Sequence, residues 1–320
     1  MSTKHLLAPD LQIIADLFPE LRLSAKMLPS FRAARAKEIT LAEPAEYNAT
    51  RKEILISREG EPDVRALLYT PDEGPNEGPN EGRGAGYLHI HGGGYVMGSP
   101  EQADAANLVL CAKLGIVVLS VSYRLAPEHS IPAPLNDCYA GLGWLHENAQ
   151  ALGVDPERIA VGGESAGGGL AAALAIHARD KGEYAICHQH LTYPMLDNQT
   201  GSAEHMGDRL VGEFVWTRQS NQFGWEGFLG DAPATAPQVP ARVEDYSGLP
   251  PAWIHTVGLD LFRDENIRYA QGLMAAGVAV ELTVYPGACH GFQFIPNTVA
   301  GNSYSKAHRA ALAHALKIEL

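Results

Sequence analysis

Short apolar runs of strand length alternate with helical segments along most of the chain. Each run is bounded by glycine, proline or charged residues, and the runs lie at 86–90, 116–123, 159–162, 190–194, 252–257 and 280–285. Helical segments are expected between them, near 102–114, 135–152, 166–180, 262–276 and 303–318. Such alternation is typical of a mainly parallel β-sheet with helices on both faces. With an opening hairpin at 54–57 and 64–69, the pattern predicts an α/β fold whose sheet has about eight strands.

Two regions fall outside this alternation. Residues 1–48 show helical amphipathicity without a place in the strand order, and residues 200–245 carry an aromatic cluster before a stretch rich in proline and alanine. We expect one α/β domain over 49–320 and a small helical cap, built from 1–48 and an insertion near 200–235. The cluster either bounds a substrate pocket or packs the cap onto the core: Phe214, Trp216, Phe223, Trp225 and Phe228. A Glu-Gly-Pro-Asn repeat at 73–80 is expected to be an exposed, mobile hairpin extension.

Charge and hydropathy narrow the range of partners. The chain has 24 lysine and arginine residues against 37 aspartate and glutamate residues, a formal net charge of −13. Since this charge repels phosphate backbones and anionic membrane surfaces, we expect neither nucleic acid nor a membrane as partner. The longest apolar stretch, residues 167–176, is far shorter than the roughly 18 residues that a membrane span needs.

A cytoplasmic location is expected from two features of the sequence. Near the N-terminus, apolar runs are interrupted by Asp10, Asp16 and Glu20 before they reach the length of a signal-peptide core. No cysteine shows CxxC spacing, which favours reduced thiols at Cys111, Cys138, Cys187 and Cys289.

A candidate nucleophile follows the apolar run at 159–162. Residues 163–167 read Gly-Glu-Ser-Ala-Gly and open a helix rich in glycine and alanine. At a sharp strand-to-helix turn, the positions two before and two after the nucleophile must lack side chains so that strand and helix can approach. Gly163 and Gly167 meet this need, and the turn sets the Ser165 hydroxyl at the positive end of the following helix.

A serine hydroxyl needs a base to take its proton and a third group to orient the base. His290 lies in a loop after the expected strand 280–285, and Asp260 follows the strand 252–257 directly. Because the carboxyl ends of parallel strands meet at one edge of a sheet, these side chains are expected to converge on Ser165. Two alternatives stay open: His290 as a solvated turn residue, and Asp264 or Glu265 as the acid.

A second glycine-rich turn is a candidate oxyanion hole. His91-Gly92-Gly93-Gly94 follows the expected buried strand 86–90. Only glycine lets the backbone approach a substrate carbonyl closely enough for its N–H groups to stabilise the developing oxyanion. The expected donors are the N–H groups of Gly93, Gly94 and Ala166. His91 is interpreted as a residue that stabilises the loop by hydrogen bonding. The alternative for the whole glycine-rich segment is a flexible turn without a catalytic role.

Two His-x-His pairs, His89/His91 and His188/His190, raise the question of a metal site. No Asp, Glu or Cys joins either pair at ligand spacing, so we expect structural histidines, no metal and no cofactor. Cys289 adjoins His290 and is interpreted as a small buried filler.

These motifs, over roughly residues 85–295, resemble the hormone-sensitive-lipase family of α/β hydrolases, in particular its bacterial carboxylesterases. The matching segments are His91 to Tyr95, Tyr123 to His129, Gly163 to Gly168, Asp260 with Asp264-Glu265, and His290 to Phe292. The family often has Asp where this chain has Glu164, and Asp-Pro-Leu where this chain has Asp260-Leu261-Phe262. The resemblance implies the α/β-hydrolase fold, an N-terminal helical cap, short- to medium-chain esters as substrates, no cofactor and frequent dimerisation.

The leading hypothesis is a serine carboxylesterase with Ser165, Asp260 and His290 as its catalytic residues. His91, Gly92 and Glu164 would support the motifs, and the expected pocket residues are Tyr95, Tyr193, Phe214 and Trp216. An amidase or peptidase could use the same residues, and some relatives with this fold are receptors that have lost the histidine. A homodimer could form through an edge strand near 280–285.

Overall fold

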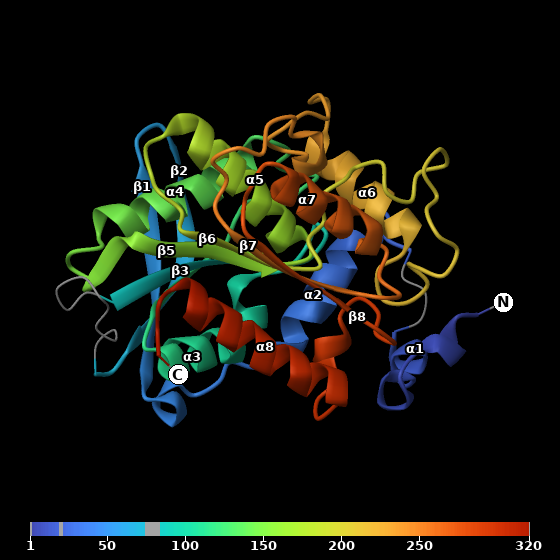
Figure 1. The fold of residues 1–320 in the computed structure, drawn as a ribbon, viewed down its shortest axis with the longest axis horizontal. Coiled ribbons are helices and arrows are strands. Elements are labelled where there is room, and N and C mark those ends of the chain that lie inside the picture. The colour runs from blue at the N-terminus through green and yellow to red at the C-terminus, as the bar shows by residue number, and fades with distance from the viewer. Residues whose placement is uncertain (1, 19–21, 74–83, 320) are drawn as a thin grey trace.

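One eight-stranded sheet forms the centre of the computed structural model, which describes residues 2–18, 22–73 and 84–319 (Figure 1). In spatial order the strands run β1-β2-β4-β3-β5-β6-β7-β8. Their bounds are β1 Ala49–Arg58, β2 Glu61–Pro71, β3 Gly84–Ile90, β4 Val117–Val121, β5 Val154–Glu164, β6 His188–Thr192, β7 Ala252–Val257 and β8 Val280–Tyr285. The β1–β2 and β2–β4 pairs are antiparallel and all the others are parallel. The predicted α/β fold, with its opening hairpin, is confirmed. The expected Glu-Gly-Pro-Asn extension lies, beyond Glu73, outside the described residues.

Helices cover both faces of the sheet. In Figure 1, α3 Asp104–Leu114 and α8 Val299–Ala315 lie below it, and α4 Ala133–Glu147, α5 Ala166–Lys181 and α7 Arg263–Ala275 lie above it. The α4 helix ends before the expected residue 152. At its end both the backbone N–H and the side chain of Asn148 donate to the carbonyl of Trp144, at 3.0 and 2.9 Å. The α8 helix begins earlier than the expected residue 303 because the Thr298 hydroxyl accepts the N–H of Gly301 and caps its first turn.

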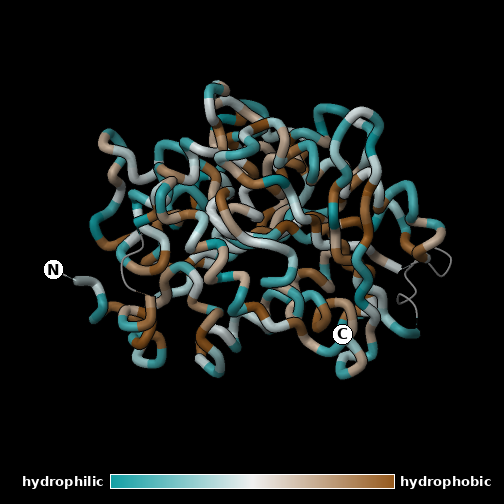
Figure 2. The backbone as a smooth tube through the Cα atoms, turned by 180° about the vertical axis from the view of Figure 1, so that it is seen from behind, coloured by the Kyte–Doolittle hydropathy of each residue, from teal (hydrophilic) through white to brown (hydrophobic). Residues whose placement is uncertain are grey.

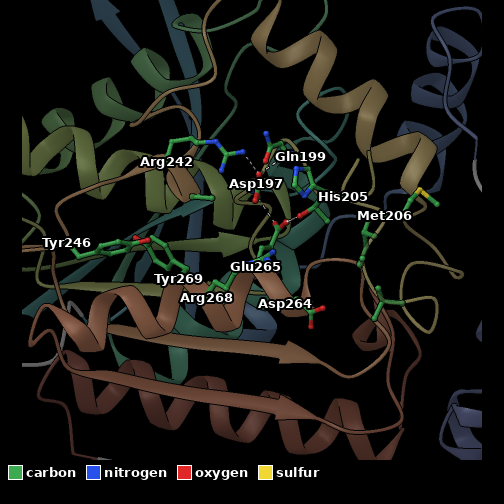
Figure 3. Close-up of a pocket in the computed structure, with 15 residues that line it drawn as sticks. Asp197, Gln199, His205, Met206, Arg242, Tyr246, Asp264, Glu265, Arg268 and Tyr269 are labelled. Carbon is green, nitrogen blue, oxygen red and sulfur yellow. Dashed lines mark hydrogen bonds and ion pairs between the residues drawn. The ribbon is translucent and has the colours of Figure 1, made fainter. Parts of the chain in front are cut away.

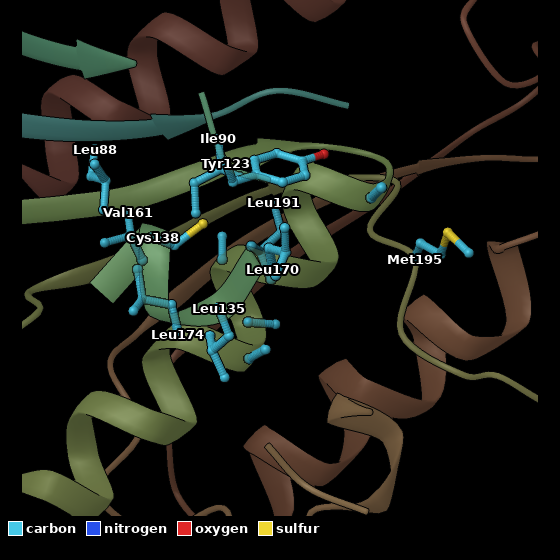
Figure 4. Packing of buried hydrophobic residues seen from close by; sticks show 14 of the residues in the cluster. Leu88, Ile90, Tyr123, Leu135, Cys138, Val161, Leu170, Leu174, Leu191 and Met195 are labelled. Carbon is cyan, nitrogen blue, oxygen red and sulfur yellow. The ribbon is translucent and has the colours of Figure 1, made fainter. Parts of the chain in front are cut away.

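The apolar strands account for most of the core. Seen from behind in Figure 2, hydrophobic segments run through the interior while the outer loops are largely hydrophilic. Above the sheet, Leu88 and Val161 of neighbouring parallel strands pack with Leu135, Leu170 and Leu174 of the helices, as Figure 4 shows. Both faces of the central strands are therefore buried, which explains why they read as continuous apolar runs rather than as alternating ones.

Residues outside the alternating pattern lie against the carboxyl edge of the sheet. The N-terminal part forms α1 Ile14–Leu17 and α2 Leu28–Glu38, and the segment after β6 forms α6 Arg218–Leu229. The two parts meet where the N–H of Leu23 donates to the Ser220 hydroxyl, at 3.2 Å. Single 3₁₀ turns complete the structure at Lys4–Leu6, Pro9–Leu11, Pro44–Tyr47, Pro100–Ala103, Pro240–Arg242 and Phe292–Phe294. The cap boundaries at 48 and 200–235 stay a prediction. Every helix in the described ranges is too short or too polar to cross a membrane.

Candidate active site

The turn between β5 and α5 holds Ser165 in a strained conformation. Its backbone has φ 58° and ψ −122°, a region that residues with a side chain rarely adopt. A Cβ on Gly163 would lie 2.0 Å from the carbonyl oxygen of Ile90, and a Cβ on Gly167 would lie 1.9 Å from the same atom. Strand β3 thus passes against this turn so closely that both glycines are required, as the sequence predicts.

Hydrogen bonds on both sides of Ser165 maintain this strain. The N–H of Ser165 donates to the carbonyl of Thr192 at 2.9 Å. Its own carbonyl accepts from the N–H of Gly169 at 2.9 Å and from that of Met195 at 3.0 Å. The turn is therefore tied to the end of β6 as well as to its own helix, and the side chain has a fixed direction.

Three predicted side chains from three different strand ends meet here. His290 Nε2 lies 3.0 Å from Ser165 Oγ, and His290 Nδ1 lies 2.7 Å from Asp260 Oδ2. A carboxylate accepts at Nδ1, so the ring proton belongs on Nδ1 and Nε2 is free to accept the serine proton. Asp260 is fully buried, and its second oxygen accepts the N–H of Phe262 at 2.9 Å. This geometry allows proton transfer from Ser165 to His290.

The rival acids of the sequence analysis lie elsewhere. Asp264 pairs with Arg263 at 2.7 Å on the outer side of α7. Glu265 is buried and accepts the N–H of Leu196 at 2.6 Å. Neither carboxylate reaches His290 because the start of α7 turns away from the site after Asp260.

Aromatic rings enclose His290. The centroid of the Tyr193 ring lies 4.4 Å from that of His290, and the Phe262 ring lies nearly perpendicular to it with 5.4 Å between centroids. Only 7% of His290 and 6% of Ser165 is exposed. The pair is thus shielded from bulk water, which strengthens the electrostatic interactions within it.

Gly93 and Gly94 adopt backbone conformations that suit glycine, with φ of +127° and +60°. A Cβ on Gly92 would come within 2.9 Å of the Glu164 carbonyl oxygen and 3.5 Å of Ser165 Cβ, so this loop runs beside the nucleophile. Among the described residues, the N–H groups of Gly93, Gly94 and Ala166 meet no protein acceptor. The Ala166 N–H is one of the unpaired donors that any helix has at its first turn. Unpaired donors next to a serine hydroxyl suit an anionic oxygen.

His91 braces this loop. Its Nδ1 donates to the carbonyl of Gly92 at 2.8 Å, and its ring stacks on Tyr123 at 4.3 Å. The Tyr123 hydroxyl in turn donates to the carbonyl of His91 at 3.0 Å. Burial lowers the pKa of His91 to about 4, so the ring stays neutral at neutral pH and keeps this donor role.

The other histidines of the two pairs have protein partners. His89 lies 2.8 Å from Ser120 Oγ and 3.2 Å from Glu164 Oε2, which links β3 to both of its neighbouring strands. His190 lies 3.4 Å from His188 and stacks on Trp253. No group of three or more His, Cys, Asp or Glu side chains in the described ranges is arranged to hold a metal ion. The structural interpretation of both pairs stays a prediction.

The four expected pocket residues differ in their surroundings. The ring of Tyr95 stacks on Phe228 of α6 at 4.0 Å and its hydroxyl donates to Met195, which leaves it 1% exposed. The Tyr95 ring thus packs against α6, and its expected pocket role stays a prediction. Its neighbour Trp225 packs the same way. Tyr193 borders His290, Phe214 packs in the same apolar cluster as Tyr193, and Trp216 covers Gly94.

Sequence reasoning missed Arg32, which anchors the loop of the oxyanion candidates from α2. Its guanidinium donates to the carbonyls of Val96 at 2.6 Å and Ala126 at 2.7 Å. It also forms a bidentate pair with Glu128 at 2.7 and 2.9 Å, and this contact lowers the pKa of the carboxylate. Nothing near Arg32 in the sequence signals these contacts, because their partners lie more than 60 residues away.

Comparison with known proteins agrees with this geometry. A family model described as an alpha/beta hydrolase fold matches residues 87–294. Carboxylesterase NlhH of Mycobacterium tuberculosis is 34% identical over 301 residues, which cover 89% of this chain and 88% of that protein. The chain belongs to the hormone-sensitive-lipase-like family of α/β hydrolases.

Further relatives share this family. Esterase LipI of Mycobacterium tuberculosis is 39% identical over 208 residues, or 64% of each chain, and carboxylic ester hydrolase LipN is 41% identical over 56% of its own length. The chain thus spans less than two thirds of these two relatives. Among solved structures, a bacterial heroin esterase has a TM-score of 0.86 and 34% identity, with 98% of this chain and 99% of that chain covered.

The glycine loop offers a direct test of the oxyanion geometry. A Cβ on Gly94 would lie 2.1 Å from the Trp216 ring, so we expect Gly94→Ala to displace the loop and to lower kcat by about 10²-fold or more. Gly277→Ala is the matched control, because Gly277 has a similar φ of +77° but no atom within 4 Å of the added methyl. Steady-state ester hydrolysis measures both variants. Parental kcat in a folded Gly94→Ala variant would contradict the assignment.

Proposed function

We propose that this chain is a serine carboxylesterase that hydrolyses short- to medium-chain carboxylic esters through an acyl-enzyme. The observation that carries the proposal is the contact of Ser165 Oγ with His290 Nε2 at 3.0 Å, while Asp260 holds Nδ1 at 2.7 Å. This pair lies at a strained strand-to-helix turn beside unpaired backbone donors. Carboxylesterase NlhH and the other esterases to which the chain is similar support the same reaction class.

In the proposed mechanism, Ser165 attacks the ester carbonyl while His290 takes the hydroxyl proton. Asp260 keeps the imidazole in its tautomer and stabilises the imidazolium that forms. The N–H groups of Gly93, Gly94 and Ala166 bind the oxyanion, each contributing roughly 3 kcal/mol to the lower barrier. His290 then protonates the departing alcohol, and a water molecule repeats the cycle on the acyl-enzyme. Every proton transfer in this cycle uses the chain's own residues, so no cofactor is required.

Two other functions use the same fold. An amidase or peptidase must protonate a leaving amine, and a receptor needs no working histidine. The position of His290 beside Ser165 favours an enzyme over a receptor. To separate these functions, p-nitrophenyl esters and the matching anilides are compared, and a fluorophosphonate probe is mapped by mass spectrometry. Ester turnover with labelling of Ser165 alone is expected, whereas faster anilide turnover or an unlabelled Ser165 would overturn the proposal.

The buried site also predicts a limit on acyl length. Phe214 and Trp216 are 7% and 5% exposed beside a nucleophile that is itself enclosed, which indicates a pocket of restricted size. Each acyl methylene that fits adds up to about 0.8 kcal/mol of binding, and the gain ends where the pocket does. Turnover of p-nitrophenyl esters should therefore rise from acetate to butyrate or hexanoate and collapse by dodecanoate. Efficient turnover of long-chain triglyceride, with activation at an oil–water interface, would instead indicate a lipase.

A cytoplasmic location and a homodimer complete the proposal. The first is supported by four cysteines without a disulfide, three of them buried. The second is supported by β8, which lies at the end of the strand order and can pair with a second copy. Light scattering after gel filtration distinguishes a dimer from a monomer.

A further inference from the structure

A chain of buried polar contacts runs beneath the cap, outside the three residues of the proposed mechanism. The indole N–H of Trp216 donates to Asn221 Oδ1 at 3.1 Å, and Asn221 Nδ2 donates to the carbonyl of Thr200 at 2.7 Å. The Thr200 hydroxyl contacts Glu265 Oε2. The other carboxyl oxygen of Glu265 accepts the N–H of Leu196 at 2.6 Å. This series of hydrogen bonds therefore joins α6 to the start of α7 and to the segment after β6.

At one end of this series of hydrogen bonds, Trp216 packs against the proposed oxyanion loop. The six-membered part of the Trp216 ring fills the space where a Cβ on Gly94 would lie, 2.1 Å away. Helix α6 comes equally near, because a Cβ on Gly224 would lie 2.7 Å from the carbonyl oxygen of Gly94. A shift of Trp216 therefore changes where the Gly94 N–H points.

The other end supports the nucleophile. Leu196 follows Met195, whose N–H donates to the carbonyl of Ser165 at 3.0 Å. Next to Glu265 on the same helix, Asn266 donates to the carbonyl of Pro194 at 2.6 Å. The first turn of α7 is thus hydrogen-bonded to the segment 194–196, and the same segment is hydrogen-bonded to Ser165.

Glu265 itself is separated from the proposed chemistry. It lines a cavity of about 360 Å³ with Asp197, Thr200, Arg242 and Tyr269, and the cavity walls include none of Ser165, Asp260 and His290 (Figure 3). Glu265 is 2% exposed and, within the described residues, its carboxyl group forms no ion pair with a cationic side chain. Any effect of Glu265 on turnover therefore acts through its neighbours and not through contact with substrate.

We propose that Glu265 is a positioning residue, which sets the oxyanion loop and the nucleophile turn in their mutual geometry through Thr200 and Leu196. The inference rests on the proposed esterase function. Displacing reacting groups by about 1 Å costs roughly 10²-fold in rate, so a link that holds both halves of the site affects kcat rather than KM.

The surroundings of Glu265 favour its neutral form. Burial raises the pKa of this carboxyl well above its usual range, and the charge of Asp197 adds to the shift, while the hydrogen bonds from Leu196 and Thr200 oppose it. A neutral amide can keep both contacts, since its oxygen accepts from Leu196 and its N–H₂ donates to the Thr200 hydroxyl. Glutamine at this position is therefore expected to work where alanine does not.

The test compares Glu265→Ala, Glu265→Gln and the control Asp264→Ala, whose side chain is 44% exposed on the same turn. A fluorophosphonate counts folded active sites, and kcat and KM for p-nitrophenyl butyrate are expressed per labelled site. For Glu265→Ala we expect kcat to fall about 10- to 100-fold and KM to change less than about 3-fold. Glu265→Gln and Asp264→Ala should stay within about 3-fold of the parent. Unchanged kcat per site in Glu265→Ala, or equal losses in Glu265→Gln, would overturn the proposal.

If Glu265→Ala fails to fold, Thr200→Val cuts the same link while keeping the side-chain shape. It should lower kcat in the same direction as the alanine variant would, with KM again changed less than about 3-fold. Parental kcat in folded Thr200→Val would also overturn the proposal. A parent protein that hydrolyses no ester refutes the proposed function instead, so the two failures are distinguishable.

Discussion

Replacing Ser165 with alanine should reduce ester turnover by about 10⁴-fold or more while the fold survives. Alanine lacks only the hydroxyl, and it tolerates the φ of 58° no worse than serine does. The hydroxyl of Ser165 is the group that lies 3.0 Å from His290 Nε2, and a loss of 10⁴-fold corresponds to roughly 5.5 kcal/mol of barrier. The rate of p-nitrophenyl butyrate hydrolysis, with circular dichroism as a check of folding, measures the effect.

Two further variants sharpen this prediction. His290→Ala should lose about as much activity as Ser165→Ala, and the double variant should lose little more, because members of a triad act as a unit. Ser57→Ala on the exposed side of β1 is the matched control and should keep parental activity. Residual activity above about a tenth of the parent in Ser165→Ala would exclude this serine as the nucleophile.

Acidification should destabilise the fold steeply below about pH 6.5. Burial lowers the pKa of four histidines to about 4, namely His91, His188, His255 and His308, and it also lowers the pKa of His190 well below its usual range. In the unfolded chain these rings take up protons near pH 6.5, whereas the folded protein keeps them neutral. The unfolded state therefore binds more protons, and stability present above pH 6.5 is lost as the pH falls towards 4.

The free energy of unfolding is expected to change steeply with pH. Each such histidine removes up to about 1.4 kcal/mol per pH unit from the free energy of unfolding, against a typical total of roughly 5–15 kcal/mol. Urea titrations at pH 8, 7, 6 and 5, followed by tryptophan fluorescence, measure it. His308→Gln should reduce the slope by about one proton, whereas the exposed His205→Gln should leave it unchanged. A free energy of unfolding that is constant between pH 7 and 5 would contradict this prediction.

Local patterns predicted the parts of this structure that depend on consecutive residues. The alternation of apolar runs and helical segments predicted a mainly parallel sheet. Gly163 and Gly167 indicated the position of the serine turn, where the approach of β3 leaves no room for a Cβ at either residue. Asp260 and His290 were also predicted from the sequence. Asp260 follows one apolar strand directly, His290 lies in the loop after the next, and the carboxyl ends of both strands must share one edge of the sheet.

Several contacts between residues far apart in the sequence depend on how the helices pack against the sheet, and the sequence patterns did not predict these contacts. The sequence favoured Asp260 by its place at a strand end but left Asp264 and Glu265 open as the acid. Only the packing of α7 separates these three carboxylates. The stacking of Tyr95 on Phe228 also depends on how α6 approaches the glycine loop.

The sequence by itself therefore determined the fold class, the strained serine turn and the residues at the strand ends, because glycine spacing and apolar runs constrain backbone conformation locally. Only the tertiary structure excluded Asp264 and Glu265 as partners of His290. It alone also showed that Arg32 anchors the glycine loop and that Glu265 lies between the cap and the nucleophile turn. The physical reason is that these hydrogen bonds join groups from separate elements. The donor–acceptor distances depend on how the helices pack against the sheet, and no short stretch of sequence specifies that packing.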